Sequence, residues 1–265
     1  MVANALVLPL LATTVLLLPP PALAERGVQG CELAIVGAGP GGVYTAWRLA
    51  VDTKTVAASS ICIFERAERV GGRTFSVYNQ GTKKDLTVEL GAYRFCGSPN
   101  ATNCAGCEMC MPMMNNLIKG KLGLHTAPYQ PGLGPDDEHC LVKVVDAEGQ
   151  NHGLARYVEK MANESKAAGV RIFLGHEATV VHAPAPGDTT GSFTVDVRCT
   201  PAGFPVTSPS SGSCTAAGAV TAKKVMLNTP LLPTLRIVRN SPSLKAHFGA
   251  KPLNHSRTSH TTGYC

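Results

Sequence analysis

The fold class is decided by residues 31–47, which read CELAIVGAGPGGVYTAW. The first part is a short apolar run that stops at a glycine, which is typical of a buried parallel β-strand. The second part continues into apolar residues at helical spacing. A further apolar run, ICIFE at residues 61–65, completes a βαβ unit of ordinary length. We therefore predict an α/β protein with a Rossmann-like fold.

The turn between this strand and this helix carries the spacing G-x-G-x-x-G at Gly37, Gly39 and Gly42. The first glycine allows a tight turn, the second lets the backbone approach a pyrophosphate, and the third lets the helix pack closely. The helix N-terminus adds free N–H donors and partial positive charge. The predicted pyrophosphate-binding residues are Gly37, Ala38, Gly39, Pro40, Gly41 and Gly42.

An acidic residue, Glu65, lies 23 positions after Gly42, at the end of the second strand. A carboxylate at this position accepts hydrogen bonds from the ribose hydroxyls of an adenosine. The alternative is a solvated glutamate at a strand end.

A second glycine turn, Gly71 and Gly72 followed by Arg73, lies within ERAERVGGRT. A second glycine turn with a cation suits a cofactor longer than NAD, because Arg73 can reach its pyrophosphate or a flavin edge; the alternative is a surface turn.

Residues 89–95, ELGAYRF, look like a strand that runs into a glycine turn. They place Arg94 between Tyr93 and Phe95. A buried guanidinium needs a partner, so this arginine requires an explanation.

These motifs together resemble the FAD-dependent amine oxidases, which include monoamine, polyamine and L-amino-acid oxidases and share the two-dinucleotide-binding-domain flavoprotein fold. The matching segments span most of residues 31–240 and read AIVGAGPGG, FERAERVGGRT, ELGAYRF, GVRIFLGHEATVV and VMLNTPLLPTL. The first two are specific to flavin folds of this type, the third points towards the amine oxidases, and the last two are looser.

The resemblance implies a role for each matching position, with FAD as the cofactor. The glycine loop would hold the pyrophosphate and Glu65 the ribose, and the backbone of Val180 would meet the adenine. Other positions would lie along the cofactor or close to its isoalloxazine ring. These are Arg66, Gly72, Arg73, Gly91, Ala92, Tyr93, Arg94, Thr229 and Pro230.

In the amino-acid oxidases of this family, an arginine at the position of Arg94 grips the substrate carboxylate. The alternatives for Arg94 are a flavin contact or a structural ion pair, for instance with Glu89. The implied activity is oxidation of amines or L-amino acids, with hydride transfer to the flavin and release of hydrogen peroxide by reaction with O2. Two other hypotheses are a flavin enzyme acting on an isoprenoid, porphyrin or carotenoid, and a non-catalytic nucleotide-binding fragment. We identify no catalytic side chain, since hydride transfer needs no general base.

The N-terminal residues 1–24 end in ALA after an apolar run and a proline break, which predicts a cleaved secretory signal. An uncleaved anchor or an organelle-targeting signal is the alternative. Sequons at Asn100, Asn163 and Asn254 would be glycosylation acceptors in the secretory pathway.

The formal net charge is +6, and the positive charge is concentrated in the C-terminal part of the chain. We favour a solvated surface over a polyanion-binding tail there, and we expect no nucleic-acid partner.

The chain has 265 residues, enough for one large or two small domains. We expect FAD-binding residues at 25–95, a cysteine-rich segment of the substrate domain at 96–150, a return to the FAD-binding domain with an inserted hairpin at 151–240, and a basic tail at 241–265. Family members are considerably longer, so the resemblance implies a chain truncated at its C-terminus, with much of the substrate cavity and an active-site lysine in the missing half.

The ten cysteines fit an oxidising compartment. Cys104, Cys107 and Cys110 have a spacing that could serve zinc or an iron–sulfur cluster, but only three thiols are local. We favour disulfides, with Cys96 and Cys140 as available partners, and predict no metal site. Cys199 and Cys214 could close a hairpin.

Overall fold

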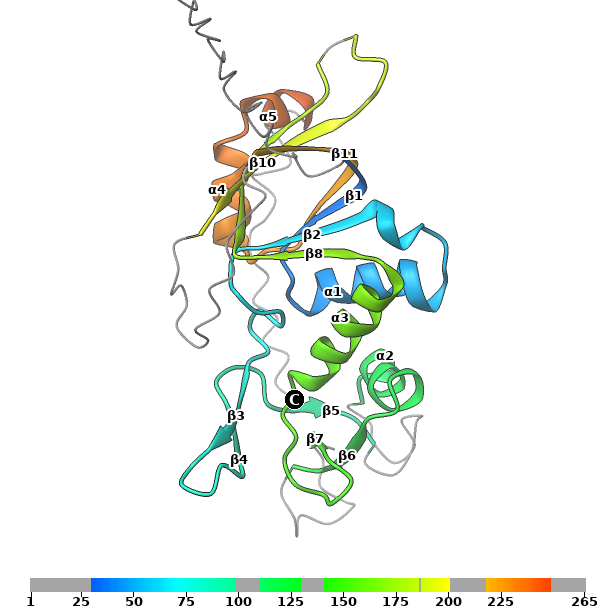
Figure 1. The fold of residues 1–265 in the computed structure, drawn as a ribbon, viewed down its shortest axis with the longest axis vertical. Coiled ribbons are helices and arrows are strands. Elements are labelled where there is room, and N and C mark those ends of the chain that lie inside the picture. The colour runs from blue at the N-terminus through cyan, green and yellow to red at the C-terminus, as the bar shows by residue number, and fades with distance from the viewer. Residues whose placement is uncertain (1–29, 99–109, 130–140, 186, 201–217, 249–265) are drawn as a thin grey trace, which may run out of the picture.

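The computed structural model describes residues 30–98, 110–129, 141–185, 187–200 and 218–248. The predicted signal and two of the three sequons lie outside these residues. A six-stranded sheet forms the centre of the molecule, in the order β8-β2-β1-β11-β10-β9 (Figure 1). The strands are β1 (Cys31–Val36), β2 (Ile61–Glu65), β8 (Arg171–Leu174), β9 (His176–His182), β10 (Phe193–Cys199) and β11 (Gly218–Leu227). The first four in the spatial order run parallel, whereas β10 is antiparallel to both of its neighbours.

The predicted βαβ unit is confirmed. Helix α1 (Pro40–Trp47) follows β1, begins with a proline, and widens into a π-type turn over Arg48–Asp52. A short 3₁₀ turn, Ala58–Ser60, then leads into β2. Because β1, β2, β8 and β11 are parallel, the loops that follow them all meet at one edge of the sheet.

Alternating side chains of the central strands build a separate core on each face of the sheet. On one face, Ile35, Ile61 and Ile63 pack with α1 and α3 (Arg156–Ala168). Helix α3 buries Tyr157, Val158 and Met161 in this core and ends at Gly169, whose φ of 109° only glycine adopts readily. On the other face, Val36 and Phe64 belong to the core that the antiparallel strands and the last two helices cover.

Those two helices, α4 (Leu231–Arg239) and α5 (Pro242–Phe248), were not expected from the sequence. Ser241, between them, donates to the carbonyl of Ile237 and accepts from the N–H of Val181 in β9. Leu244 of α5 is buried. The stretch that we assigned to a basic tail therefore begins with a helix packed on the sheet.

A second, smaller layer lies below the main sheet in Figure 1. It contains the hairpin β3 (Ser76–Gln80) and β4 (Leu86–Glu89), and a three-stranded sheet in the order β5-β7-β6. The strands of this sheet are β5 (Phe95–Cys96), β6 (His125–Pro128) and β7 (Leu141–Val145). The cysteine-rich segment contains helix α2 (Pro112–Asn115), which continues as a π-type turn over Asn116–Lys121. No helix in the described part of the chain is long and apolar enough to cross a membrane.

A disulfide that the sequence did not suggest joins Cys31 in β1 to Cys62 in β2. Cys96, Cys110 and Cys199 are also disulfide-bonded. The described residues contain no group of side chains suited to a metal ion. The interpretation of the cysteines as disulfides is thus confirmed for the described ones, while Cys104, Cys107, Cys140 and Cys214 lie outside these residues.

We expect replacement of Cys31 and Cys62 together by alanine to lower the free energy of unfolding by about 3 to 4 kcal/mol. The two cysteines are 31 positions apart, and a crosslink over such a loop removes that much conformational freedom from the unfolded chain. Urea unfolding of both proteins measures the difference. An unchanged midpoint would contradict a structural role for this disulfide.

Candidate functional site

The glycine loop after β1 is built as the spacing predicts. Gly37 has a φ of 103°, and its N–H donates to the carbonyl of Phe64 at 2.8 Å. Gly42 touches the same turn so closely that a Cβ there would lie 2.1 Å from the Gly37 carbonyl oxygen. At Gly39, by contrast, a Cβ would meet only the Asn228 amide nitrogen at 3.9 Å. The loop is therefore closed on its inner side and open at Gly39, the position where the backbone has to meet a pyrophosphate.

Glu65 lies beside this loop at the end of β2. Its carboxylate accepts hydrogen bonds from the N–H of Ala38 and the N–H of Ala67, both at 2.8 Å. Each carboxylate oxygen can accept a second hydrogen bond. Glu65 is thus fixed against the glycine loop and keeps acceptor capacity for two ribose hydroxyls.

The second glycine turn packs directly on the first. The N–H of Gly71 donates to the carbonyl of Ala38 at 2.8 Å, and a Cβ on Gly72 would lie 3.1 Å from the Gly39 Cα. Gly71 and Gly72 both have positive φ values, 102° and 53°, which favour glycine. The two turns form one continuous surface of backbone.

Arg69 supports this turn, and the sequence reasoning missed it. Its guanidinium donates to the carbonyl of Gly72 at 2.8 Å and to the carbonyl of Val70 at 3.2 Å, and it lies 3.7 Å from the centroid of the Phe75 ring. Burial lowers the pKa of Arg69, while Glu65 opposes that effect. Its position inside the motif ERAERVGGRT was the signal available for finding it.

The segment after β4 packs against the second glycine turn. The N–H of Leu90 donates to the carbonyl of Phe75, and the N–H of Ala92 donates to the carbonyl of Arg73 at 3.0 Å. A Cβ on Gly91 would lie 1.9 Å from that same Arg73 oxygen. Gly91 and Ala92 are exposed. The structure therefore brings together three predicted segments, around Gly39, Gly72 and Gly91.

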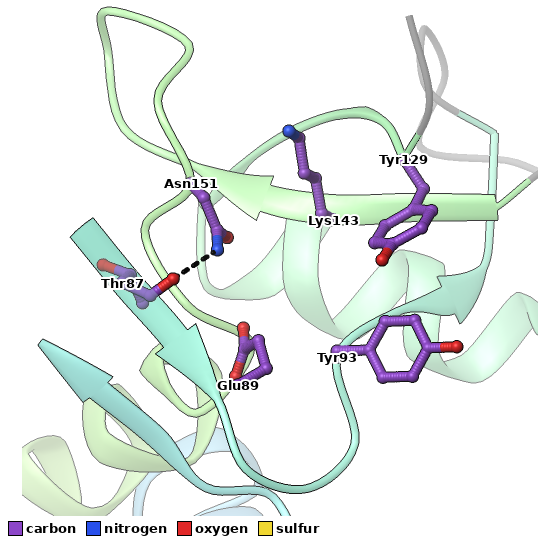
Figure 2. A pocket seen from close by; sticks show the side chains of 6 residues that line it. All are labelled: Thr87, Glu89, Tyr93, Tyr129, Lys143 and Asn151. Carbon is purple, nitrogen blue, oxygen red and sulfur yellow. Dashed lines mark hydrogen bonds between the residues drawn. The ribbon is translucent and has the colours of Figure 1, made fainter.

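Arg94 lies just beyond this segment, next to two tyrosine rings. Its guanidinium carbon is 4.8 Å from the centroid of the Tyr93 ring and 5.3 Å from that of Tyr129. Both tyrosines line a pocket of about 530 Å³, shown in Figure 2. The other residues that line this pocket are Thr87, Glu89, Lys143 and Asn151.

The suggested ion pair between Arg94 and Glu89 is not formed. The Glu89 carboxylate instead accepts from the Ser76 hydroxyl at 2.5 Å and from the N–H of Leu154 at 2.6 Å. Ser76 in turn accepts from the N–H of Ala155. Glu89 and Ser76 therefore cap the N-terminus of α3 from another part of the chain, where a carboxylate is favoured by the free N–H groups and the helix dipole.

We expect Ser76→Ala to lower the free energy of unfolding by about 2 kcal/mol. Ser76 is buried, and its loss leaves a buried N–H and a carboxylate oxygen without a partner. Thermal and urea unfolding measure the cost. Glu89→Gln acts on the same network, so the double variant should lose less than the sum of the single losses; strictly additive losses would contradict the shared cap.

The remaining predicted residues take various positions. Arg66 and Arg73 are exposed after β2 and in the second glycine turn. Val180 lies in β9 opposite Asp196, within the antiparallel part of the sheet. Thr229 follows β11, and its hydroxyl shares a hydrogen bond with Thr234 in the first turn of α4. The roles of all of these positions towards the cofactor stay predictions.

Asn228, just before Thr229, is a second residue that the sequence reasoning missed. Its N–H donates to the carbonyl of Val36, and its carbonyl oxygen lies 2.5 Å from where a Gly37 Cβ would be. Its side-chain amide faces Gly41 and Gly42 at 2.7 and 3.0 Å from their Cβ positions. Asn228 thus closes the glycine loop from the end of β11.

Comparison with known proteins agrees with this geometry. Residues 35–105 match the family model described as an NAD(P)-binding Rossmann-like domain. The chain is 26% identical over 199 residues to the mitochondrial electron transfer flavoprotein-ubiquinone oxidoreductase of Pongo abelii, covering 68% of this chain and 27% of that protein. It is 40% identical over 71 residues to Aplysianin-A of Aplysia kurodai, covering 27% of this chain and 12% of that one.

Among solved structures, the chain is similar to THI4 of Thermovibrio ammonificans, with a TM-score of 0.44 and 18% identity over 80% of this chain and 61% of that one. The chain spans about a quarter or less of the length of the curated relatives it matches. The family match coincides with the segments that meet at the sheet edge. Residues 35–105 therefore match an NAD(P)-binding Rossmann-like domain, in agreement with the predicted fold.

Proposed function

We propose that this chain is the FAD-binding part of an oxidase that acts on L-amino acids. The observation that carries the proposal is the meeting of the glycine loop, the second glycine turn and the Gly91 segment, with Arg94 two residues beyond Ala92. The first two segments suit a dinucleotide, and the third leaves exposed backbone next to the pocket with the arginine. The proposal extends to related amines, which share the chemistry of the carbon beside the nitrogen.

The residues present fit FAD. The open space at Gly39 admits a pyrophosphate, which the N-terminus of α1 would hold. Glu65 would bind the ribose, and Gly91 and Ala92 would lie along the ring system. When bound, FAD accepts a hydride from the carbon that bears the amine and passes the electrons to O2, which gives hydrogen peroxide. The protein orients that carbon and excludes water from the pocket.

Arg94 supports an anionic substrate. Among the described residues it makes no ion pair, and two tyrosine rings hold its guanidinium. Its two parallel N–H groups match a carboxylate. An apolar isoprenoid or carotenoid would leave this cation desolvated and without a partner, so we favour the amino-acid substrate over those alternatives.

We further propose that the protein works in the secretory pathway or outside the cell. The predicted signal at residues 1–24 supports this, as does the disulfide between Cys31 and Cys62. Asn163 is exposed on α3 and could carry a glycan.

The test is to express the whole chain in an oxidising host, supply FAD, and record its visible absorbance after desalting. We expect a retained flavin band, and peroxide release when L-amino acids are added. A colourless protein would support the alternative of a non-catalytic fragment. A flavin-loaded protein that oxidises amines but no amino acid would contradict the role of the carboxylate.

A further inference from the structure

The pocket in Figure 2 has two charged side chains in its lining, Glu89 and Lys143. Glu89 and Tyr93 stand on either side of Gly91 and Ala92 in the chain. The pocket is therefore next to the segment that we place along the flavin. What it binds depends on which of the two charges is free to meet a ligand.

The charge of Glu89 is already compensated. Its two oxygens accept from the Ser76 hydroxyl and from the N–H of Leu154, which lies two residues before the 13-residue helix α3. The positive end of that helix attracts the negative charge of this carboxylate. Recruiting Glu89 to a ligand would weaken this cap, so it is poorly suited to bind a cationic side chain.

The charge of Lys143, by contrast, is not compensated by an ion pair among the described residues. It lies in the middle of β7, where its neighbours Val142 and Val144 are completely buried on the core side of the small sheet. Lys143 therefore projects from the other face, where it is half-buried and lines the pocket. Within the described residues no ion pair involves its ammonium group. The uncompensated charge of the pocket is positive.

The walls of the pocket suit a short chain that ends in a charge. Tyr93 and Tyr129 have ring centroids 5.3 Å apart and provide two aromatic surfaces. Tyr129 and Lys143 extend from adjacent strands on the same face, because Lys143 pairs with Ala127, two residues before Tyr129. The side-chain amide of Asn151 donates a hydrogen bond to the carbonyl of Thr87 (Figure 2). Arg94 contacts both tyrosine rings, and Lys143 is the cation in the lining of the pocket itself.

We propose that this pocket binds the side chain of an amino-acid substrate that carries a second carboxylate, with Lys143 as its counter-ion. Arg94, which contacts both tyrosine rings, would hold the first carboxylate. This inference rests on the proposed function for the identity of the substrate. It predicts a preference for acidic amino acids, and more generally for dicarboxylates of similar length.

The test measures binding to the whole chain by calorimetry, with glutarate as the dicarboxylate probe and butyrate as the monocarboxylate probe. We expect glutarate to bind the unaltered protein at least tenfold more tightly. Lys143→Met should weaken glutarate binding by about 10- to 100-fold and leave butyrate binding unchanged, as expected for the loss of one charge-assisted contact. Lys143→Arg keeps the charge and should retain most of the affinity. Lys83→Met, in the exposed turn of the β3–β4 hairpin, is the control for net charge.

Equal binding of the two probes, or equal glutarate binding by the protein with and without Lys143→Met, would overturn the inference. These measurements need no flavin, so they separate this proposal from the proposed oxidase activity. If the flavin-loaded protein oxidises neutral amino acids and Lys143→Met leaves the ratio of acidic to neutral turnover unchanged, the oxidase proposal stands and the role of Lys143 fails. If glutarate binds selectively but no amino acid is oxidised, the pocket assignment stands as a dicarboxylate site and the oxidase proposal fails.

Discussion

Gly42→Ala and Gly39→Ala are expected to damage the protein in two different ways, although both remove a glycine from the same loop. A Cβ at Gly42 would lie 2.1 Å from the Gly37 carbonyl oxygen and 3.2 Å from the Ile35 side chain. Both neighbours belong to β1 and its turn, so neither can move without shifting the strand. We expect Gly42→Ala to lose about 3 kcal/mol or more of folding free energy, because overpacking here displaces backbone.

At Gly39 the same change should leave the folded protein almost untouched. A Cβ there would find nothing closer than 3.9 Å, and the residue has an ordinary φ of −68°. The added methyl group would, however, occupy the open space in which we propose that the backbone meets the pyrophosphate of FAD. We expect the free energy of unfolding of Gly39→Ala to lie within about 1 kcal/mol of that of the unaltered protein. We expect this variant to bind FAD at least about 100-fold more weakly.

The pair is measured by urea unfolding without cofactor and by FAD titration followed through flavin fluorescence. Each variant serves as the control for the other. If Gly39→Ala bound FAD as well as the unaltered protein, the cofactor would not lie on this loop. If Gly42→Ala were fully stable, the close approach between α1 and its turn would be wrong.

The parts of the fold that could be predicted from the sequence are those that local pattern determines. The β1–α1–β2 unit depends on periodicity and on glycine at turns, which a single segment carries. The meeting of the glycine loop with Gly72 could also be expected, since the parallel strands β1 and β2 deliver their following loops to one edge of the sheet. Gly91 follows β4 of the separate antiparallel hairpin, so only the family resemblance implied its place beside them.

The features that could not be predicted depend on contacts between distant segments. The disulfide joins cysteines with no spacing signature, and sequence alone does not give connectivity. The cap on α3 comes from Glu89, 65 positions before Leu154. Helix capping is normally sought within a few residues, so Glu89 looked instead like a partner for its neighbour Arg94. Asn228 and Arg69 support the two glycine turns through contacts that their residue types do not indicate in the sequence.

Arg94→Ala is expected to reduce kcat/KM for L-amino acids by about 100- to 1,000-fold while FAD is retained. Removing one partner of a desolvated guanidinium–carboxylate pair costs roughly 2 to 5 kcal/mol, and each 1.4 kcal/mol is a factor of about ten in rate. Arg94→Lys should recover only part of this loss, because an ammonium group cannot form the two parallel bonds of a guanidinium. Peroxide release under saturating O2 gives the rates, and the visible spectrum gives the flavin content.

The matched control is the substrate rather than a second residue. An amine that lacks the carboxylate but keeps the side chain makes no contact with a carboxylate clamp. If the arginine acts only on that group, the slow oxidation of this amine should be the same in the unaltered protein and in the Arg94→Ala variant. Equal losses for the amine and the amino acid would instead show that Arg94 acts on the flavin or on the Tyr93–Tyr129 pair that it contacts. A loss confined to the amino acid is the result that a clamp requires, since only a carboxylate then gains binding energy from the guanidinium.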